Sequence, residues 1–354
     1  MTGLRRFLDQ GPAGPAGWLV LGALWPLSLL YGTAMRVRAA LYRAGIFRVH
    51  RASVPVISIG NLTAGGTGKT PVTDALARRL LARNLRVAVV SRGYGGRCPG
   101  EVGKVSGGDG ALLLTPAAAG DEPCLLAERN PRLSVYVARR RRRGVAAAVA
   151  DGAQCVLLDD AFQHLAVARD LDIVLLDARR PFGNGHLLPA GSLREPPAAL
   201  RRAGLLLLTH ADGAAKSIPL PGVPTIACRH RLANHLLDSA GRPASWSAVT
   251  GANCLAFAGI AHPEDFFAAL RGRGVALAAA WPLADHQRYT PEQLRSLSRE
   301  CDNGRVLLTT EKDAVKLRAL GFDKPYYRVP LELEFDDADL LDEAIEAVLT
   351  GVRP

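Results

Sequence analysis

Short apolar runs recur along the chain and are separated by stretches with helical periodicity or many glycines. In the first two thirds these runs lie at residues 54–59, 85–90, 133–138, 155–160, 171–178 and 205–210. Continuous apolar runs are typical of strands that are buried on both faces of a parallel sheet. The pattern therefore predicts an α/β fold, with a parallel sheet covered by helices on both faces.

The pattern weakens and becomes polar at residues 229–253, which predicts a linker or a small β insert. Alternating strands and helices then resume with CLAFAGI, HPEDFFAAL, VALAAAW, TPEQLRSL and RVLLTT. A last helix is predicted to begin near Asp336 and to bury Leu341, Ile345 and Val348. The predicted segments are an N-terminal segment (1–50), a core (51–228), the linker (229–253) and a smaller C-terminal α/β unit (254–354).

Residues 10–35 contain no charged side chain, and arginines follow at positions 36, 38, 43 and 48. The segment is long enough to span a bilayer, but Pro26 and several glycines make it a poor span, and it lacks a signal-peptide cleavage site. We expect a helix that lies in or dips into the cytoplasmic leaflet, with Trp18, Trp25 and Tyr31 near the headgroups. The alternative is a core helix beneath the domain.

The composition limits the classes of molecule that the protein is expected to bind. The net charge of +11 favours an anionic partner: nucleic acid, a phosphorylated substrate or a membrane surface. Only 6% of the residues are aromatic and no zinc-finger spacing occurs, which argues against nucleic acid. The six cysteines are scattered without a CxxC pair, as in a reduced cytosolic protein without structural zinc.

ISIGNLTAGGTGKTP, at residues 57–71, combines a buried strand, a glycine-rich loop and the start of a helix. This order predicts a P-loop whose backbone N–H groups bind phosphate. Lys69 would reach the β- and γ-phosphates, and the Thr70 hydroxyl would bind Mg²⁺. The expected nucleotide-binding residues are Thr63, Ala64, Gly65, Gly66, Thr67, Gly68, Lys69 and Thr70. Thr63 stands where the P-loop pattern has glycine, so an ordinary glycine-rich turn is the alternative.

CVLLDD, at residues 155–160, resembles a Walker B strand that carries carboxylates to the magnesium beside Thr70. Since Asp159 and Asp160 alternate across the strand, only one of them is expected to face the metal. The alternative is a strand-ending aspartate that caps a turn. Gln163 and His164 follow at the same edge of the sheet.

Two further loops contain titratable residues. Asp121 of GDEP suits a helix N-cap and equally suits a base that accepts a proton from a hydroxyl, and the residues alone do not separate these interpretations. His286 of DHQRY could be a solvated loop residue or could be oriented by its neighbour Asp285.

Arginines occur in two other stretches. Arg194 and Glu195 lie in the GSLREP loop, where arginine suits phosphate binding. The arginines of residues 139–143 are interpreted as a solvated helix start, with contact to an anion as the less favoured alternative.

Neither of two stretches satisfies the Asn-Lys-x-Asp pattern that GTPases use to read guanine. Thr209–Asp212 lacks the Asn and the Lys, and Glu311–Asp313 lacks the spacing. ATP is therefore the expected nucleotide.

Taken together, the motifs resemble those of the tetraacyldisaccharide 4′-kinase family, P-loop kinases of lipid A biosynthesis in Gram-negative bacteria. The resemblance covers nearly the whole chain and rests on GNLTAGGTGKTP, SRGYGG, GDEP, LLDDAFQH, RDLDIVLLDA, GSLREP, FAGIAHPEDFF, DHQRYT and TTEKDAVKL. The family shares the Thr63 departure. It commonly has Gly and Arg where this chain has Ala161 and Leu165, which leaves open what replaces that arginine.

The resemblance implies transfer of the ATP γ-phosphate to the 4′-hydroxyl of a tetraacylated glucosamine disaccharide 1-phosphate. It implies that Asp121 is the catalytic base and that His286 assists it. It also implies that Thr70, Asp159 and Asp160 hold Mg²⁺. The substrate-binding residues that it implies are Tyr94, Gln163, His164, Arg194 and Glu195.

The expected partners are the lipid disaccharide and the cytoplasmic leaflet of the inner membrane, with no nucleic acid and no obligate protein partner. A P-loop GTPase or metal-insertion chaperone of similar topology is the main alternative. An ATP-dependent ligase of a small soluble acid is a third, and it leaves the apolar N-terminus unexplained.

Overall fold

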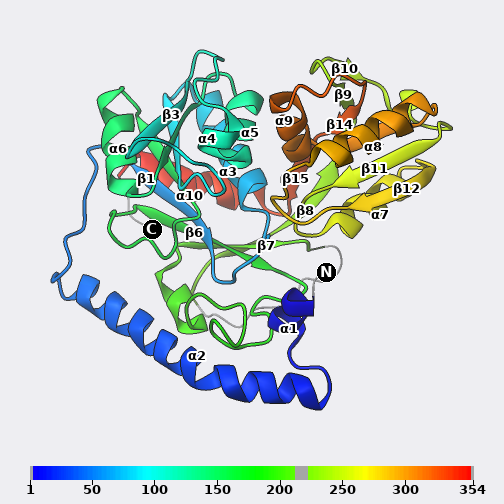
Figure 1. The fold of residues 1–354 in the computed structure, drawn as a ribbon. Helices are drawn as coiled ribbons and strands as arrows, with labels where there is room; N and C mark the ends of the chain where they lie inside the picture. Colours follow the sequence, from blue (N-terminus) through cyan, green and yellow to red (C-terminus); the bar gives the residue numbers. More distant parts are fainter. Residues whose placement is uncertain (1–2, 212–221, 352–354) are drawn as a thin grey trace. The chain divides into compact units, whose positions relative to one another are not determined.

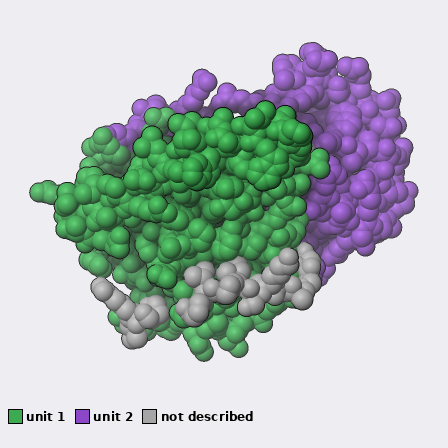
Figure 2. Space-filling model, turned by 90° about the horizontal axis from the view of Figure 1, so that it is seen from below, with its two compact units in different colours: residues 1–92, 138–229, 333–354 green, residues 93–137, 230–332 purple. Residues whose placement is uncertain are grey.

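The chain folds into two compact units, each made of discontinuous segments. In a computed structural model, residues 3–211 and 222–351 are described. Unit 1 comprises residues 1–92, 138–229 and 333–354, and unit 2 comprises residues 93–137 and 230–332 (Figure 2). The segment boundaries predicted at residues 50, 228 and 253 remain predictions. Asp212, the last residue of the stretch compared with the guanine motif, lies outside the described residues.

Unit 1 is built on a mostly parallel sheet, as the apolar runs predict. Its strands are β1 (Val56–Asn61), β2 (Val87–Ser91), β5 (Cys155–Asp159), β6 (Leu171–Asp177), β7 (Leu205–Thr209), β8 (Thr225–Leu232) and β15 (Leu331–Phe335). They lie in the order β15-β8-β7-β6-β1-β5-β2, and the unit boundary falls inside β8 and β15. Every pairing from β8 to β2 is parallel. The carboxyl ends of β1 and β5 therefore lie side by side, which is where ligands bind in such sheets.

The helices of unit 1 are α1 (Gly3–Gln10), α2 (Gly14–Arg43), α3 (Lys69–Ala82), α6 (Arg141–Ala150), η1 (Pro197–Arg202) and α10 (Ala338–Leu349). Helix α3 packs against β1, β5 and β2 through a buried face that includes Leu76 and Leu80. The predicted last helix is confirmed as α10, which buries Leu341, Ile345 and Val348. A second apolar cluster surrounds Phe162, Val174 and Leu200.

The apolar N-terminal segment forms the 30-residue helix α2, which runs beside the rest of unit 1 as one long rod (Figure 1). By length and composition alone it could cross a membrane. Only Leu21, Ser28 and Gly32 of this helix are buried. Ser28 donates a hydrogen bond to the Leu187 carbonyl, and the Tyr31 hydroxyl donates to the Arg194 carbonyl. The core-helix alternative does not fit, because most of the apolar surface of α2 is exposed.

Unit 2 contains β3 (Val102–Gly107) and β4 (Ser134–Ala138), whose last residue belongs to unit 1, and a six-stranded sheet. The sheet strands are β9 (Leu236–Asp238), β10 (Pro243–Ala244), β11 (Cys254–Ala258), β12 (Leu277–Pro282), β13 (Val306–Thr310) and β14 (Tyr327–Val329). Their order is β10-β9-β14-β13-β11-β12. Strand β9 is antiparallel to both of its neighbours, β10 and β14, and the other pairings are parallel.

The helices of unit 2 are α4 (Pro116–Ala119), α5 (Asp121–Arg129), α7 (Pro263–Gly272), α8 (Pro291–Asp302) and α9 (Glu311–Ala319), with η2 at Trp246–Ala248. Strand β11 alternates between two apolar clusters. Ala256 packs in the cluster that contains Phe267 of α7, and Phe257 packs in the cluster that contains Leu297 of α8 and Leu317 of α9. Period-two alternation of apolar side chains therefore places helices on both faces of this smaller sheet.

Candidate functional site

The phosphate-binding loop of unit 1 connects β1 to α3. Gly68 is the N-cap residue of α3 and has φ = 79°, a left-handed conformation that glycine adopts without the Cβ clash of other residues. No side chain caps this helix end, so its first N–H groups remain available to an anion. Inside the loop, the Asn61 amide donates to the Thr67 hydroxyl at 2.9 Å. The local geometry suits phosphate.

Thr63, the departure from the P-loop pattern, pairs with Leu193 in an isolated antiparallel bridge. The neighbouring Ala64 N–H donates to the Ser192 carbonyl at 2.6 Å. An extended residue suits this pairing, so glycine is not needed at the first loop position. The bridge fastens the phosphate loop to the GSLREP loop, which carries Arg194 and Glu195.

Asp160 lies between two cations of unit 1. Its Oδ1 is 2.7 Å from an Arg194 guanidinium nitrogen and 3.5 Å from Lys69 Nζ. Burial alone would raise the pKa of the Asp160 carboxyl, but Lys69 and Arg194 lower it below its ordinary value. Asp160 also has φ = 48°, and non-glycine residues in this left-handed conformation are often found at functional sites. The carboxylate is therefore held ionised next to the P-loop lysine.

Asp159 is buried and accepts hydrogen bonds from the Thr73 and Ser91 hydroxyls, each at 3.3 Å. The two aspartates thus face different surroundings, in agreement with their alternation along the strand. Thr70, Asp159 and Asp160 supply oxygen donors, the class that Mg²⁺ prefers. No cluster of three or more His, Cys, Asp or Glu that could hold a metal occurs among the described residues. A magnesium ion at this site would complete its coordination shell with phosphate and water oxygens, as Mg²⁺ usually does in proteins.

Arg141 corrects one sequence interpretation. The arginines of residues 139–143 were expected to form a solvated helix start. Four of them are exposed, as expected, but Arg141 is only 3% exposed. Its guanidinium donates to the Ala138 carbonyl at 3.0 Å and to the Asp159 carbonyl at 3.1 Å. Burial lowers the pKa of Arg141 to about 10, so the group remains charged near neutral pH. Arg141 therefore braces the end of β5 that carries the two aspartates.

Two of the predicted substrate-binding residues of unit 1, Gln163 and Glu195, are held by protein side chains or carbonyls, and a third, His164, is partly buried. Gln163 donates to the Asn61 carbonyl at 2.9 Å and accepts from Arg194 at 3.4 Å. Burial lowers the pKa of His164 to about 4, so its imidazole is neutral near pH 7. Glu195 is 3% exposed and pairs with Arg202 at 2.6 Å. Contact of these residues with a substrate remains a prediction.

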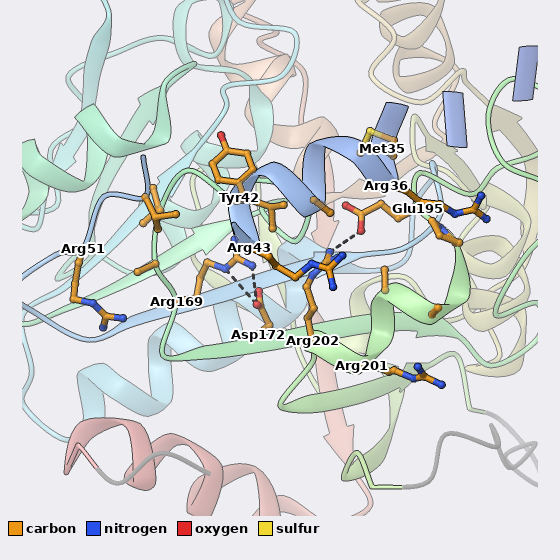
Figure 3. A pocket seen from close by; sticks show the side chains of 18 residues that line it. Met35, Arg36, Tyr42, Arg43, Arg51, Arg169, Asp172, Glu195, Arg201 and Arg202 are labelled. Carbon is orange, nitrogen blue, oxygen red and sulfur yellow. Dashed lines mark hydrogen bonds and ion pairs between the residues drawn. The ribbon is translucent and has the colours of Figure 1, made fainter. Parts of the chain in front are cut away.

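A cavity of about 640 Å³ lies against the second half of α2 (Figure 3). Its wall includes Glu195 and Leu165, the residue that stands where the family commonly has arginine. The arginines around it are Arg36, Arg43, Arg51, Arg169, Arg201 and Arg202. Arg169 is paired with Asp172, and Arg51 lies 3.6 Å from Asp170. Of the arginines at this cavity, the sequence analysis identified only those of α2. The others come from distant segments of the chain, so their proximity was not visible in the sequence.

Asp121 and His286 meet in unit 2. His286 Nδ1 lies 3.1 Å from Asp121 Oδ1, although 165 positions separate the two residues. Burial alone would raise the pKa of Asp121, but the hydrogen bond to His286 and the nearby Lys312 lower it to about 2. Neighbouring Asp285 does not orient His286 through Nδ1, because Asp121 is the partner of Nδ1. Asp285 instead lies on the other side of the ring, 3.8 Å from Nε2.

The start of α5 sets the position of Asp121. Gly120 is the N-cap residue and Asp121 is the first helical residue, so the N-cap interpretation of Asp121 is wrong. Gly120 has φ = 94°, and a Cβ there would lie 2.6 Å from the Tyr94 carbonyl oxygen. The loop that carries Tyr94 thus packs closely on the helix start. The Tyr94 ring contacts His286 edge-on, with 5.1 Å between the ring centroids.

Helices α5 and α9 pack together and are joined by ion pairs. Arg129 pairs with Glu311 at 3.0 Å, Lys312 pairs with Glu122 at 3.3 Å, and Arg318 pairs with Glu128. The sequence analysis considered residues 311–313 as a guanine motif and as part of TTEKDAVKL, but it assigned no role to Lys312. The signal that could have found it is its place in TTEKDAVKL, directly after a strand.

The geometry divides the predicted residues into two groups. Unit 1 brings together the P-loop, Asp159, Asp160, Gln163 and Arg194. Unit 2 brings together Tyr94, Asp121 and His286. The first group suits phosphate and a magnesium ion, and the second suits proton transfer.

Comparison with known proteins supports this chemistry. Residues 20–350 match the sequence model of the family described as tetraacyldisaccharide-1-P 4′-kinase. A tetraacyldisaccharide 4′-kinase of Syntrophotalea carbinolica is 46% identical over 99% of this chain and 98% of the relative. A tetraacyldisaccharide 4′-kinase of Geobacter sulfurreducens is 42% identical over 98% of this chain and 99% of the relative. A crystal structure of LpxK from Aquifex aeolicus, described as an apo form in complex with ATP, superposes with a TM-score of 0.80. It is 31% identical and covers 93% of this chain and 99% of that one. The GTPase or metal-insertion chaperone alternative is not favoured.

The Asp121–His286 pair makes the stability of the fold depend on pH. Burial lowers the pKa of His286, but the hydrogen bond to Asp121 raises it, and the net shift is upward from 6.5. The folded state therefore binds a proton more tightly than the unfolded state, and this stabilisation is lost as the pH rises from 6.5 through the raised pKa. We expect the stability advantage of the wild type over His286→Gln, measured by urea unfolding, to shrink as the pH rises from 6.5 through the raised pKa of His286.

The matched control is His235→Gln, because His235 is exposed in the same unit. This variant should track the wild type at every pH. If the stability advantage of the wild type over His286→Gln stays constant as the pH rises, the raised pKa assigned to His286 is contradicted.

Proposed function

The chain belongs to the tetraacyldisaccharide-1-P 4′-kinase family, and from that premise we propose how its residues carry out the transfer. The substrates are ATP and a tetraacylated glucosamine disaccharide 1-phosphate of lipid A biosynthesis, whose 4′-hydroxyl receives the γ-phosphate. The observation that carries the catalytic assignment is the His286–Asp121 hydrogen bond, which leaves one carboxylate oxygen open.

The residues of unit 1 bind and orient the nucleotide. The N–H groups of the loop before α3 donate to the phosphates, and Lys69 neutralises charge on the β- and γ-oxygens. Arg194 and Lys69 keep Asp160 ionised between them. When bound, Mg²⁺ supplies further positive charge to these oxygens, and Thr70 with Asp159 or Asp160 would hold it.

Asp121 accepts the proton of the attacking hydroxyl. Its Oδ1 already accepts from His286 and from the Glu122 N–H, each at 3.1 Å. Among the described residues nothing lies within hydrogen-bond distance of Oδ2, and the nearest cation is Lys316, 3.9 Å away. As the 4′-oxygen bonds to the γ-phosphorus and the bond to the β-phosphate oxygen breaks, the hydroxyl proton moves to Oδ2.

A carboxyl group with a pKa of about 2 is a weak base, and phosphoryl transfer tolerates this. The transition state is largely dissociative, so the hydroxyl becomes acidic only as its bond to phosphorus forms. The low pKa keeps Asp121 ionised near neutral pH. The carboxylate therefore orients the hydroxyl first and accepts its proton late.

Helix α2 brings the enzyme to its lipid acceptor. Trp18, Leu19, Trp25 and Leu30 are each about half exposed or more, and such a row of apolar side chains is typical of a membrane-contact surface. Arginines 36, 43 and 201 at the nearby cavity have no acidic partner among the described residues, which suits them to anionic headgroups. The proposed location is the cytoplasmic leaflet of the inner membrane.

Asp121→Asn should abolish most transfer while leaving nucleotide binding intact. An amide cannot accept the proton, and the loss expected for a general base is about 10²–10⁴-fold in kcat. Phosphorylation of the lipid disaccharide by γ-labelled ATP measures kcat, and equilibrium binding of an ATP analogue measures affinity. The control is Asp323→Asn, at an exposed carboxylate of the same unit, which should behave as wild type. Retained transfer in Asp121→Asn would refute the role of Asp121 as base.

Charges placed on the exposed face of α2 should release the protein from membranes. Leu19 and Leu30 are 77% and 69% exposed. Burial of one leucine side chain contributes about 1.5–3 kcal/mol, so Leu19→Asp or Leu30→Asp should lower vesicle partitioning at least about tenfold. Sedimentation with phosphatidylglycerol vesicles measures this. Leu320→Asp, at the exposed C-cap residue of α9, should leave partitioning unchanged. Equal losses in all three variants would contradict contact through α2.

A further inference from the structure

Lys312 of α9 lies at the centre of the proton-transfer group. Its ammonium nitrogen is 3.0 Å from Asp285 Oδ1, 3.3 Å from Glu122 Oε1 and 3.1 Å from His286 Nε2. The side chain is only 13% exposed. Thr310 accepts a hydrogen bond from the Asp313 N–H and caps α9, which fixes the first turn that carries Lys312. Three acceptors thus surround a group that has three N–H donors.

The chemistry of these groups fixes where the histidine proton lies. An ammonium group donates hydrogen bonds and cannot accept them. Burial lowers the pKa of Lys312, but Glu122, Asp121 and Asp285 raise it above its ordinary value, so the group is charged. In neutral His286, the ring nitrogen that faces Lys312 must therefore present a lone pair. Glu122 and Asp285 lie 3.7 and 3.8 Å from this nitrogen, beyond hydrogen-bond distance.

We propose that Lys312 is a positioning residue that holds neutral His286 in the tautomer with its proton on Nδ1. The Nδ1–H then donates to Asp121 Oδ1 at 3.1 Å. The inference rests on the proposed function, in which Asp121 is the base. The opposite tautomer would place the Nδ1 lone pair against a carboxylate oxygen, and the orientation of Asp121 would be lost. Lys312 thus acts on the reaction through His286.

In the described part of the chain, the charged groups that contact His286 belong to three segments. Asp121 and Glu122 come from α5, Asp285 from the loop of His286 itself, and Lys312 from α9. Lys316, four positions after Lys312 on α9, lies 3.9 Å from Asp121 Oδ2. Among the described residues, only Lys312 places a cation at hydrogen-bond distance from Nε2, so its removal should make His286 easier to protonate.

The tautomer can be measured in the full chain without substrate. In protein labelled with ¹⁵N-histidine, the nitrogen shifts of His286 above its pKa should show a protonated Nδ1 and an unprotonated Nε2. His286→Gln assigns the signals. A protonated Nε2 in the wild type would overturn the proposal, and this result needs no variant of Lys312 to fold.

Lys312→Met should let the two tautomers mix and raise the pKa of His286 by about one unit, which is a tenfold change in protonation. The pH dependence of the His286 nitrogen shifts measures this change in pKa. Lys312→Arg should restore the tautomer, because guanidinium also only donates. Lys324→Met, which breaks a remote ion pair with Asp302, should change none of these.

A purely structural role for Lys312 would lower the thermal midpoint of Lys312→Met while leaving the tautomer and the pKa of His286 unchanged, and that result would overturn the proposal. The proposed function fails separately. If Asp121→Asn keeps its transfer activity, Asp121 is not the base, whatever the nitrogen shifts of His286 show.

Discussion

The hydrogen bond between His286 and Asp121 is the interaction on which the catalytic account depends. It joins the start of α5 to a loop 165 positions later in the chain, and α9 supports both through ion pairs. His286 has φ = 57°, a left-handed conformation that costs roughly 1–2 kcal/mol outside glycine. Such a conformation persists where the surrounding contacts determine it, and here those contacts are Asp121, Lys312 and the Tyr94 ring.

A similar constraint operates in unit 1. Because β1 and β5 are parallel neighbours, the phosphate loop and the two aspartates are delivered to the same edge of the sheet. Arg141 donates a hydrogen bond to the carbonyl of Asp159, the last residue of β5. The Thr63–Leu193 bridge connects the phosphate loop to the loop that carries Arg194. Each unit thus holds its reactive groups with buried hydrogen bonds and ion pairs, which preorganises the groups before any substrate is present.

Much of this could be predicted from sequence. Apolar runs located the parallel strands, and GGTGKT located the loop, because both signals are local. Contacts between distant segments were beyond that reasoning. The residues around Asp121 alone left its role undecided between helix cap and catalytic base, because the contact with His286 that separates these roles is not local in sequence. Arg141 was misread because an arginine run normally faces solvent, and the carbonyls that accept its hydrogen bonds lie elsewhere in the fold. Lys312 was overlooked because its partners are 26 and 190 positions away.

The most direct test of the central claim is a double-mutant cycle on kcat with Asp121→Asn, His286→Ala and the double variant. Residues that act as one unit give strongly non-additive losses. The account predicts that the double variant transfers phosphate about as slowly as Asp121→Asn alone. If the two single losses multiply in the double variant, the residues act independently, and the account of a histidine-oriented base is contradicted.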